Sequence, residues 1–363
     1  MRHGKYGSKN MRVLVTGHNG YVGTIMVPML EEAGYDIVGL DSNLYEGSTF
    51  GEMNKNRDFP EIKKDIRDIE ANDLKGVDAI IHLAGLSNDP LGDLNPDLTF
   101  EINYKASLRI ATLAKKVGVE RFIFSSSCSN YGAGVQEWLD ENSSFNPVTP
   151  YGASKVKVEQ EVAKLADNNF SPTFLRSGTA YGVSPRLRFD LVLNNLIAWA
   201  FTTGKVFLKS DGSAWRPIVH IRDMSLAFLS VLSAPRDLIH NEAFNVGRTE
   251  ENYRISDIAD IVAQTVPGSK IEYSTGAEPD KRNYRVLCDK ISQTLPGYKP
   301  QWTARLGAKE LHEAYKRVGL RQEEFEGPRY RRIDHIKQLL SSGRLDNTLR
   351  WATQAENQGI NNE

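Results

Sequence analysis

The chain has few cysteines and no long apolar run, and both absences narrow what it can be. Among its 363 residues only Cys128 and Cys288 are cysteines, so no disulfide framework is expected. No apolar stretch approaches the ~20 residues that a membrane-spanning helix needs, and residues 1–10 lack the apolar segment of a signal peptide. These absences predict a cytoplasmic protein that makes no membrane contact.

The chain also lacks an excess of either charge. Its 45 basic and 46 acidic residues give a formal net charge of −1, which offers no electrostatic reason to bind nucleic acid or an anionic membrane. No cluster of Cys and His residues has the spacing of a metal site, so no metal is expected. The length allows one large domain with a smaller lobe, or two domains.

A glycine-rich loop follows the first apolar stretch. Residues 11–16 form a short β-branched run typical of a buried parallel strand, and Gly17, Gly20 and Gly23 follow it directly. Glycines at this spacing allow a tight turn and let backbone N–H groups approach a pyrophosphate at a helix N-terminus. The next apolar run ends in Asp41, which suits the ribose 2′-hydroxyl of NAD and would repel the 2′-phosphate of NADP. Without the strand and Asp41, the glycines would indicate only a turn.

A second group of polar residues lies in the middle of the chain. Residues 121–124 resemble another buried strand, and the serines 125–127 lie at its carboxyl end, where open parallel sheets bind ligands. Tyr151 and Lys155 are four residues apart in a segment of good helix formers, so their side chains share one helix face. A free tyrosine has a pKa of about 10, and a nearby ammonium would favour the phenolate and lower that pKa. We predict that these groups move a proton while a cofactor moves a hydride.

In this order and at these distances, the motifs resemble those of the extended short-chain dehydrogenases/reductases. The specific resemblance is to the nucleotide-sugar epimerase/dehydratase family, which includes UDP-galactose 4-epimerase. It implies an α/β fold with a doubly wound, Rossmann-like parallel sheet and a smaller C-terminal substrate-binding lobe. It also implies an NAD cofactor, a nucleotide-sugar substrate and a homodimer built through two helices, 98–117 and 151–166.

The domain limits follow from the order of strand and helix patterns along the chain. The NAD-binding domain is predicted at 11–182 with 216–247 returning to it, the substrate lobe at 183–215 and 248–330, and a C-terminal extension at 331–363. The polar tail from about Leu345 is expected to be mobile.

The resemblance assigns roles to individual residues. Tyr151 is the catalytic base, Ser127 hydrogen-bonds the reacting hydroxyl, and Lys155 binds the cofactor ribose and tunes the tyrosine. The residues expected to contact the cofactor are Gly17, Gly20, Tyr21, Val22, Gly23, Asp41, Asp65, Ile66, Leu83, Ala84, Gly85, Asn103, Ser125, Tyr151 and Lys155. Those expected to contact the substrate are Ser87, Ser127, Tyr151, Thr179, Asn195, Arg216 and Arg282. Arginine suits a diphosphate because its guanidinium matches two phosphate oxygens at once.

Four residues of the second half depart from the family pattern or add to it. Ser177 and Thr179 stand where the family usually has an aromatic residue or Cys and an Asn, which puts the sugar-facing contacts in doubt. Arg186 and Arg188 could bind a phosphate or an acidic sugar, but solvated loop arginines are the more common case and are expected here.

The predicted reaction is NAD-dependent epimerisation of a nucleotide sugar through transient oxidation of a hydroxyl, expected at C4. Members that catalyse 4,6-dehydration typically carry Asp and Glu after the catalytic hydroxyl, whereas this chain has Cys128 and Ser129, so that reaction is disfavoured. A nucleotide-sugar reductase or dehydrogenase of the same family is the main alternative. A non-catalytic NAD(H)-binding sensor is less favoured because it has no need of the three catalytic residues, and nothing in the composition favours a scaffold.

Overall fold

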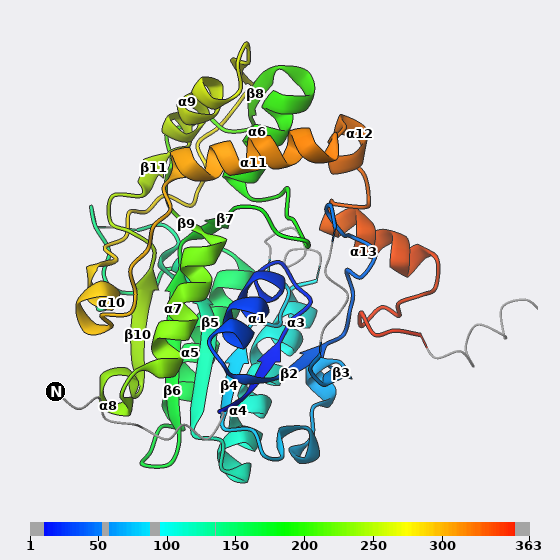
Figure 1. Ribbon diagram of the computed structural model, residues 1–363. Coiled ribbons are helices and arrows are strands. Elements are labelled where there is room, and N and C mark those ends of the chain that lie inside the picture. Colours follow the sequence, from blue (N-terminus) through cyan, green and yellow to red (C-terminus); the bar gives the residue numbers. More distant parts are fainter. Residues whose placement is uncertain (1–10, 53–57, 88–94, 135, 353–363) are drawn as a thin grey trace, which may run out of the picture.

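A parallel sheet of seven strands forms the largest part of the protein (Figure 1). The structure, a computed structural model, describes residues 11–52, 58–87, 95–134 and 136–352. In sheet order the strands are β10 (Glu242–Val246), β6 (Ser171–Ser177), β5 (Arg121–Ser127), β4 (Ala79–His82), β1 (Arg12–Thr16), β2 (Asp36–Asp41) and β3 (Glu61–Lys63). The chain runs outward from β1 to β3 and then crosses to β4, so the strand order reverses between β1 and β4. Ligands of open parallel sheets bind at such a reversal.

Helices cover both faces of the sheet, because successive strand residues point to opposite sides. Leu14 belongs to the core under α4 (Ala106–Val117) and α5 (Pro150–Ala163), whereas Val13 and Val15 pack with α1 (Gly23–Glu32) and α7 (Ile221–Ser233). Burial on both faces explains the nearly continuous apolar strands. The α/β fold class and the doubly wound sheet predicted from the sequence are confirmed.

A smaller lobe lies beyond the carboxyl ends of the strands (Figure 1). Its helices are α6 (Val192–Thr203), α9 (Ile255–Thr265), α11 (Ala304–Val318) and α12 (Gln322–Phe325), and a parallel pair, β8 (Lys205–Leu208) and β12 (Lys270–Tyr273), lies beside them. A three-stranded sheet, β7 (Thr179–Tyr181), β9 (Trp215–His220) and β11 (Asn252–Arg254), joins the lobe to the large sheet. The lobe has its own core, in which Leu193, Ile258 and Leu311 are fully buried.

Shorter elements complete the described chain. They are η1 (Ile66–Asp68), η2 (Ala71–Leu74), α3 (Pro96–Thr99), the π-helical turn η3 (Phe100–Lys105), η4 (Cys128–Tyr131), α8 (Arg236–Ile239), α10 (Asp289–Thr294) and α13 (Arg332–Ser341). Of the helices in these ranges, none is long and apolar enough to cross a membrane.

The C-terminal extension packs against the core that lies on one face of the large sheet. Leu345 and Leu349 are buried in the same core as α4 and α5. The prediction of a mobile tail from about Leu345 is therefore wrong for residues 345–352, because these leucines supply apolar anchors in a stretch that is otherwise polar. Residues 353–363 lie outside the described part of the chain.

Candidate active site

A cavity of about 760 Å³ lies at the carboxyl ends of β1, β2, β4, β5 and β6, between the large sheet and the smaller lobe. Every residue that the sequence predicted to contact cofactor or substrate lines it, with the exception of Asn103 and Asn195. The fold therefore brings together in one cavity residues that are up to 265 positions apart in the sequence, from Gly17 to Arg282.

The glycine loop leaves room for a dinucleotide diphosphate. Gly17 has a φ of +76°, and a Cβ there would lie 2.9 Å from the backbone nitrogen of Ala84. A Cβ on Gly23 would lie 2.5 Å from the carbonyl oxygen of Gly17. Among the described residues, no side chain caps the start of α1 at Val22. The N–H groups of the first helical turn and the helix dipole at this end suit a pyrophosphate.

Asp41 at the end of β2 is held in a fixed orientation. Its two carboxylate oxygens accept backbone N–H groups from Asn19 (3.0 Å) and Asn43 (2.8 Å). Each oxygen keeps a second lone pair for a ribose hydroxyl. The acidic residue predicted from the sequence thus lies beside the glycine loop with acceptor capacity facing the cavity.

The residues predicted to be catalytic, Ser127, Tyr151 and Lys155, lie at the start of α5 and the end of β5. Thr149 accepts a hydrogen bond from the N–H of Gly152 (3.2 Å) and so caps the helix just before Tyr151. Lys155 donates to the carbonyl oxygen of Ser125 (2.7 Å), and its Nζ lies 5.7 Å from the centre of the Tyr151 ring. Burial lowers the pKa of Lys155 to about 7, although the nearby Glu159 carboxylate opposes this shift. The ammonium is thus close enough to stabilise a phenolate.

Ser127 is prepared to donate a proton into the cavity. Its Oγ accepts hydrogen bonds from both the N–H (3.1 Å) and the hydroxyl (2.9 Å) of Ser129. A serine oxygen has two acceptor lone pairs and one proton. Because both lone pairs are used, the Ser127 proton remains for an oxygen in the cavity. Ser129, which the sequence analysis treated only as the place of a missing acid, thus orients the hydroxyl of Ser127.

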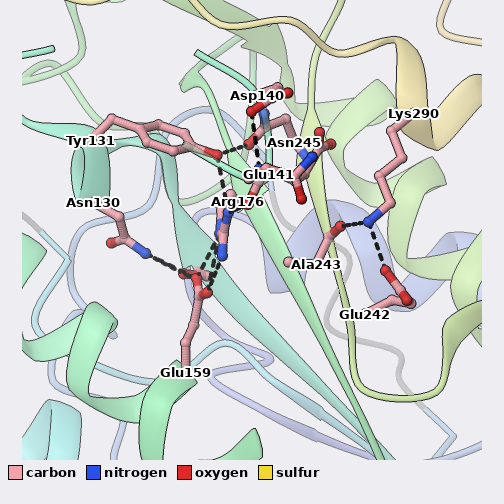
Figure 2. Close-up of polar contacts among 12 residues, drawn as sticks. Asn130, Tyr131, Asp140, Glu141, Glu159, Arg176, Glu242, Ala243, Asn245 and Lys290 are labelled. Atoms are coloured by element: carbon pink, nitrogen blue, oxygen red, sulfur yellow. Dashed lines mark hydrogen bonds and ion pairs between the residues drawn. The ribbon is translucent and has the colours of Figure 1, made fainter. Parts of the chain in front are cut away.

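A buried ion pair locks α5 against the sheet (Figure 2). Arg176 on β6 contacts both carboxylate oxygens of Glu159, the shortest contact being 2.7 Å. Glu159 also accepts hydrogen bonds from Ser126 on β5 and from Asn130 (2.9 Å). One carboxylate thus ties the helix of Tyr151 to two strands. Sequence reasoning missed it, although an arginine inside the apolar strand 171–177 requires a buried partner.

Arg176 is also held from its other side. It donates to the hydroxyl of Tyr131 (3.1 Å) and to the carbonyl oxygen of Glu141 (2.9 Å). Tyr131 in turn donates to Asn245 on β10 (2.8 Å), as Figure 2 shows. The network therefore extends over three neighbouring strands, and it fixes the strand end that carries Ser127.

The two predicted contacts that lie outside the cavity have structural partners instead. Asn103 bonds the backbone N–H (2.8 Å) and carbonyl (3.0 Å) of Leu86, and it donates to Ser154 (3.3 Å). Asn103 therefore fixes the loop that follows β4 but does not itself line the cavity. Asn195 donates to the carbonyl oxygen of Phe189 (2.8 Å), so no substrate contact is evident for it.

Arg186 and Arg188 are not solvated loop residues, and that prediction is wrong. They are 5% and 9% exposed and line the cavity. Arg186 is drawn inward because it donates to the carbonyl oxygens of Asn19 (3.2 Å) and Glu46 (2.9 Å). Burial opposes the charge on Arg188, but its two-point contact with Asp190 (2.6 and 3.0 Å) raises the pKa above the ordinary value.

A second group of cations lies on the lobe side of the cavity. Arg216 and Arg282 both contact Asp280, each with one nitrogen at 2.8 Å. Arg216 is 5% exposed, and burial lowers its pKa. Its Nη2 lies at ion-pair distance from Asp280 but makes no aligned hydrogen bond within the described residues. A buried donor without an aligned acceptor suits the oxygen of a phosphate.

The fold and the cavity together define a dinucleotide-binding α/β enzyme. The sequence profile described as the NAD dependent epimerase/dehydratase family matches residues 13–247. The chain belongs to that family, and NAD is its cofactor.

Relatives of known description carry out different reactions. A putative UDP-glucose 4-epimerase of Methanocaldococcus jannaschii is 28% identical over 306 residues, which are 82% of this chain and 96% of that protein. The dTDP-D-glucose 4,6-dehydratase of Mus musculus is 25% identical over 332 residues, 87% of this chain and 92% of that one. A solved structure of MoeE5 in complex with UDP-glucose and NAD is 25% identical, with a TM-score of 0.72, and covers 85% of this chain and all of its own.

Proposed function

We propose that this protein is an NAD-dependent epimerase that inverts a nucleotide sugar at C4. The observation that carries the proposal is the meeting of Ser127, Tyr151 and Lys155 in one cavity with two separate groups of arginines. Two groups suit two diphosphates, one in the dinucleotide and one in the nucleotide sugar. Relatives described as UDP-glucose 4-epimerases support the choice of carbon.

The side chains supply the proton chemistry of such a reaction. Tyr151 takes the proton of the sugar hydroxyl, and Ser127 donates a hydrogen bond to the same oxygen. The Lys155 ammonium stabilises the phenolate that the reaction needs and re-forms. When bound, NAD accepts the hydride of the sugar carbon and returns it. Because Tyr151 gives its proton back in the second half, the side chains end in the state in which they began.

The diphosphate of the sugar nucleotide is assigned to Arg216 and Arg282. Asp280 holds both guanidiniums, and the unaligned Nη2 of Arg216 suits a phosphate oxygen. Anchoring at this end leaves the sugar ring free to present either face to the catalytic group. Thr179 and Ser177 line the same cavity as this anchor and Tyr151.

The site does not favour 4,6-dehydration, although dehydratases are among the relatives. That reaction needs an acid/base pair, whereas Ser129 is neutral and already bonds Ser127. Cys128 is 1% exposed, donates to the carbonyl oxygen of Arg176 and does not line the cavity. Burial raises the pKa of its thiol, so Cys128 cannot replace the missing acid.

We also propose a homodimer formed through α4 and α5, which is the arrangement that the family resemblance implies. The measurement is the molar mass in solution by light scattering after gel filtration. A mass near 41 kDa, that of one chain, would contradict the proposal.

A panel of nucleotide sugars incubated with the enzyme and NAD tests the reaction. A product of unchanged mass whose ring couplings differ by NMR is the expected result, and it would identify the substrate. Loss of two hydrogens by mass spectrometry would instead establish the dehydrogenase. Loss of water would overturn the argument from Cys128 and Ser129.

A further inference from the structure

The C-terminal segment 329–351 lies along the loop that follows Asp41. Trp351 donates to the carbonyl oxygen of Ser42 (2.6 Å), and His335 donates to that of Leu44 (2.9 Å). Arg329 donates to the carbonyl oxygen of Thr49 (2.8 Å). In Figure 1 helix α13 lies beside this loop. The course of the chain after β2 is therefore fixed by residues close to 300 positions later in the sequence.

The segment does more than support the loop, because two of its side chains line the cavity. They are Arg332 and Leu349. The Arg332 guanidinium lies 4.2 Å from the centre of the Tyr45 ring, which also lines the cavity. This stacking orients the planar guanidinium on the cavity wall.

The charge of Arg332 is not balanced by a carboxylate partner among the described residues. Arg332 and Arg188 line the same cavity, and burial followed by the positive charge of Arg188 lowers the pKa of Arg332. Arg188 pairs closely with Asp190 and also donates to Ser87, whereas Arg332 stacks on Tyr45. Two cations on one wall, with a single close carboxylate, form a site for an anion.

The position identifies the anion. Arg332 stacks on Tyr45, which follows Asp41 at the ribose end of the dinucleotide site, and Arg186, from the same loop as Arg188, donates to the carbonyl oxygen of Asn19 in the glycine loop. The space between a ribose-binding carboxylate and a glycine loop is that of the dinucleotide diphosphate. The other diphosphate has its own arginines in the lobe. We propose that the segment 329–351 forms one wall of the dinucleotide site and that Arg332, together with Arg188, binds the diphosphate of NAD.

Binding of NAD, ADP and adenosine to nucleotide-free protein, measured by calorimetry, tests this assignment. In the variant Arg332→Gln the dissociation constants of NAD and ADP should rise roughly tenfold or more, because a charge-assisted hydrogen bond is lost. The affinity for adenosine should not change, since it has no phosphate. Arg332→Lys should recover part of the loss for ADP, because it keeps the charge but not the fork.

Two further variants distinguish a direct contact between Arg332 and phosphate from a general effect of segment 329–351 on the shape of the site. Lys337→Gln, which removes one positive charge from an exposed position of the same helix, should leave all three affinities unchanged. Trp351→Ala removes the bond to Ser42 and should weaken all three ligands by a similar factor. Unchanged ADP binding in Arg332→Gln would overturn the proposal, as would an equal loss for adenosine. No substrate is present, so the outcome does not depend on whether the reaction is epimerisation.

Discussion

At the scale of single residues, the reaction depends on which hydroxyl takes a proton and which one gives it. Tyr151→Phe removes the proposed base without changing the shape of the helix. Turnover should fall by at least ~10²-fold, whereas NAD binding should stay close to that of the native protein. The measurement is kcat alongside the dissociation constant of NAD. Tyr273→Phe, at a position 52% exposed, is the matched control. Near-normal turnover of Tyr151→Phe would remove the tyrosine from the mechanism.

Ser127 and Ser129 should differ in how much they contribute. Ser127→Ala deletes the proton donor to the reacting oxygen, and losses of about 10²-fold are typical for one such donor. Ser129→Ala leaves that donor and the backbone N–H of residue 129 in place and frees only one lone pair of Ser127, so kcat should fall less than tenfold. Steady-state kinetics of the two variants decide this order. An equal loss in both would mean that Ser129 contacts the substrate itself.

The sequence predicts the place of a residue when a neighbouring strand or helix defines it, but it does not reveal which polar side chains tertiary contacts will bury. Gly17, Asp41 and Tyr151 could be placed because each occupies a position defined by a neighbouring strand or helix. The burial of Arg186 depends on carbonyl groups of Asn19 and Glu46, which no local pattern reveals. The same holds for Ser129, whose role becomes visible only in the turn that brings its hydroxyl back to Ser127.

At the scale of elements, the ion pair between α5 and β6 should influence the pH dependence of catalysis. The Glu159 carboxylate favours the ammonium form of Lys155, so Glu159→Gln should lower the pKa of Lys155 below about 7. If the ammonium is the active form, the fall in kcat/KM toward high pH should begin at lower pH in this variant. Glu161→Gln, on the same helix and paired with Lys164, should leave the profile unchanged.

The same substitution should reduce stability, because it leaves Arg176 buried without a counter-charge. Breaking a buried pair in this way costs about 3–5 kcal/mol. Chemical denaturation measures the loss. Ser126→Ala removes one contact of Glu159 without unpairing a charge and should cost much less. A pH profile that does not move in Glu159→Gln would limit Glu159 to a structural role.

The helix predicted at 98–117 shows what periodicity can and cannot reveal. The structure has α3, a π-helical turn over Phe100–Lys105 and α4 in its place. Helical patterning indicates the element but not its π turn, within which Asn103 bonds the backbone of Leu86. Such a distortion arises from tertiary contacts, and it lies directly behind the cavity.

At the scale of the whole molecule, the alternation of strands and helices was sufficient to predict the doubly wound sheet. It was not sufficient to place the C-terminal segment. The contacts of Trp351 and His335 reach Ser42 and Leu44 across most of the chain, and they use backbone carbonyls that carry no sequence signal. The near-zero net charge was equally uninformative, because it conceals two concentrated groups of arginines in one cavity.

The two groups of arginines, Arg188 with Arg332 and Arg216 with Arg282, should affect nucleotide affinity separately when one residue is substituted. Added salt should weaken binding at both groups. Because phosphates are held by partly buried guanidiniums, the affinities for ADP and UDP should both fall as ionic strength rises and screening shortens from ~30 Å at 0.01 M to ~8 Å at 0.15 M. Arg216→Gln should weaken UDP roughly tenfold and leave ADP unchanged. Arg332→Gln should do the reverse. Calorimetric titration of each variant with each nucleotide gives the four values needed. If Arg216→Gln weakened ADP as much as UDP, the two groups would serve a single diphosphate, and the division of the cavity between cofactor and substrate would be wrong.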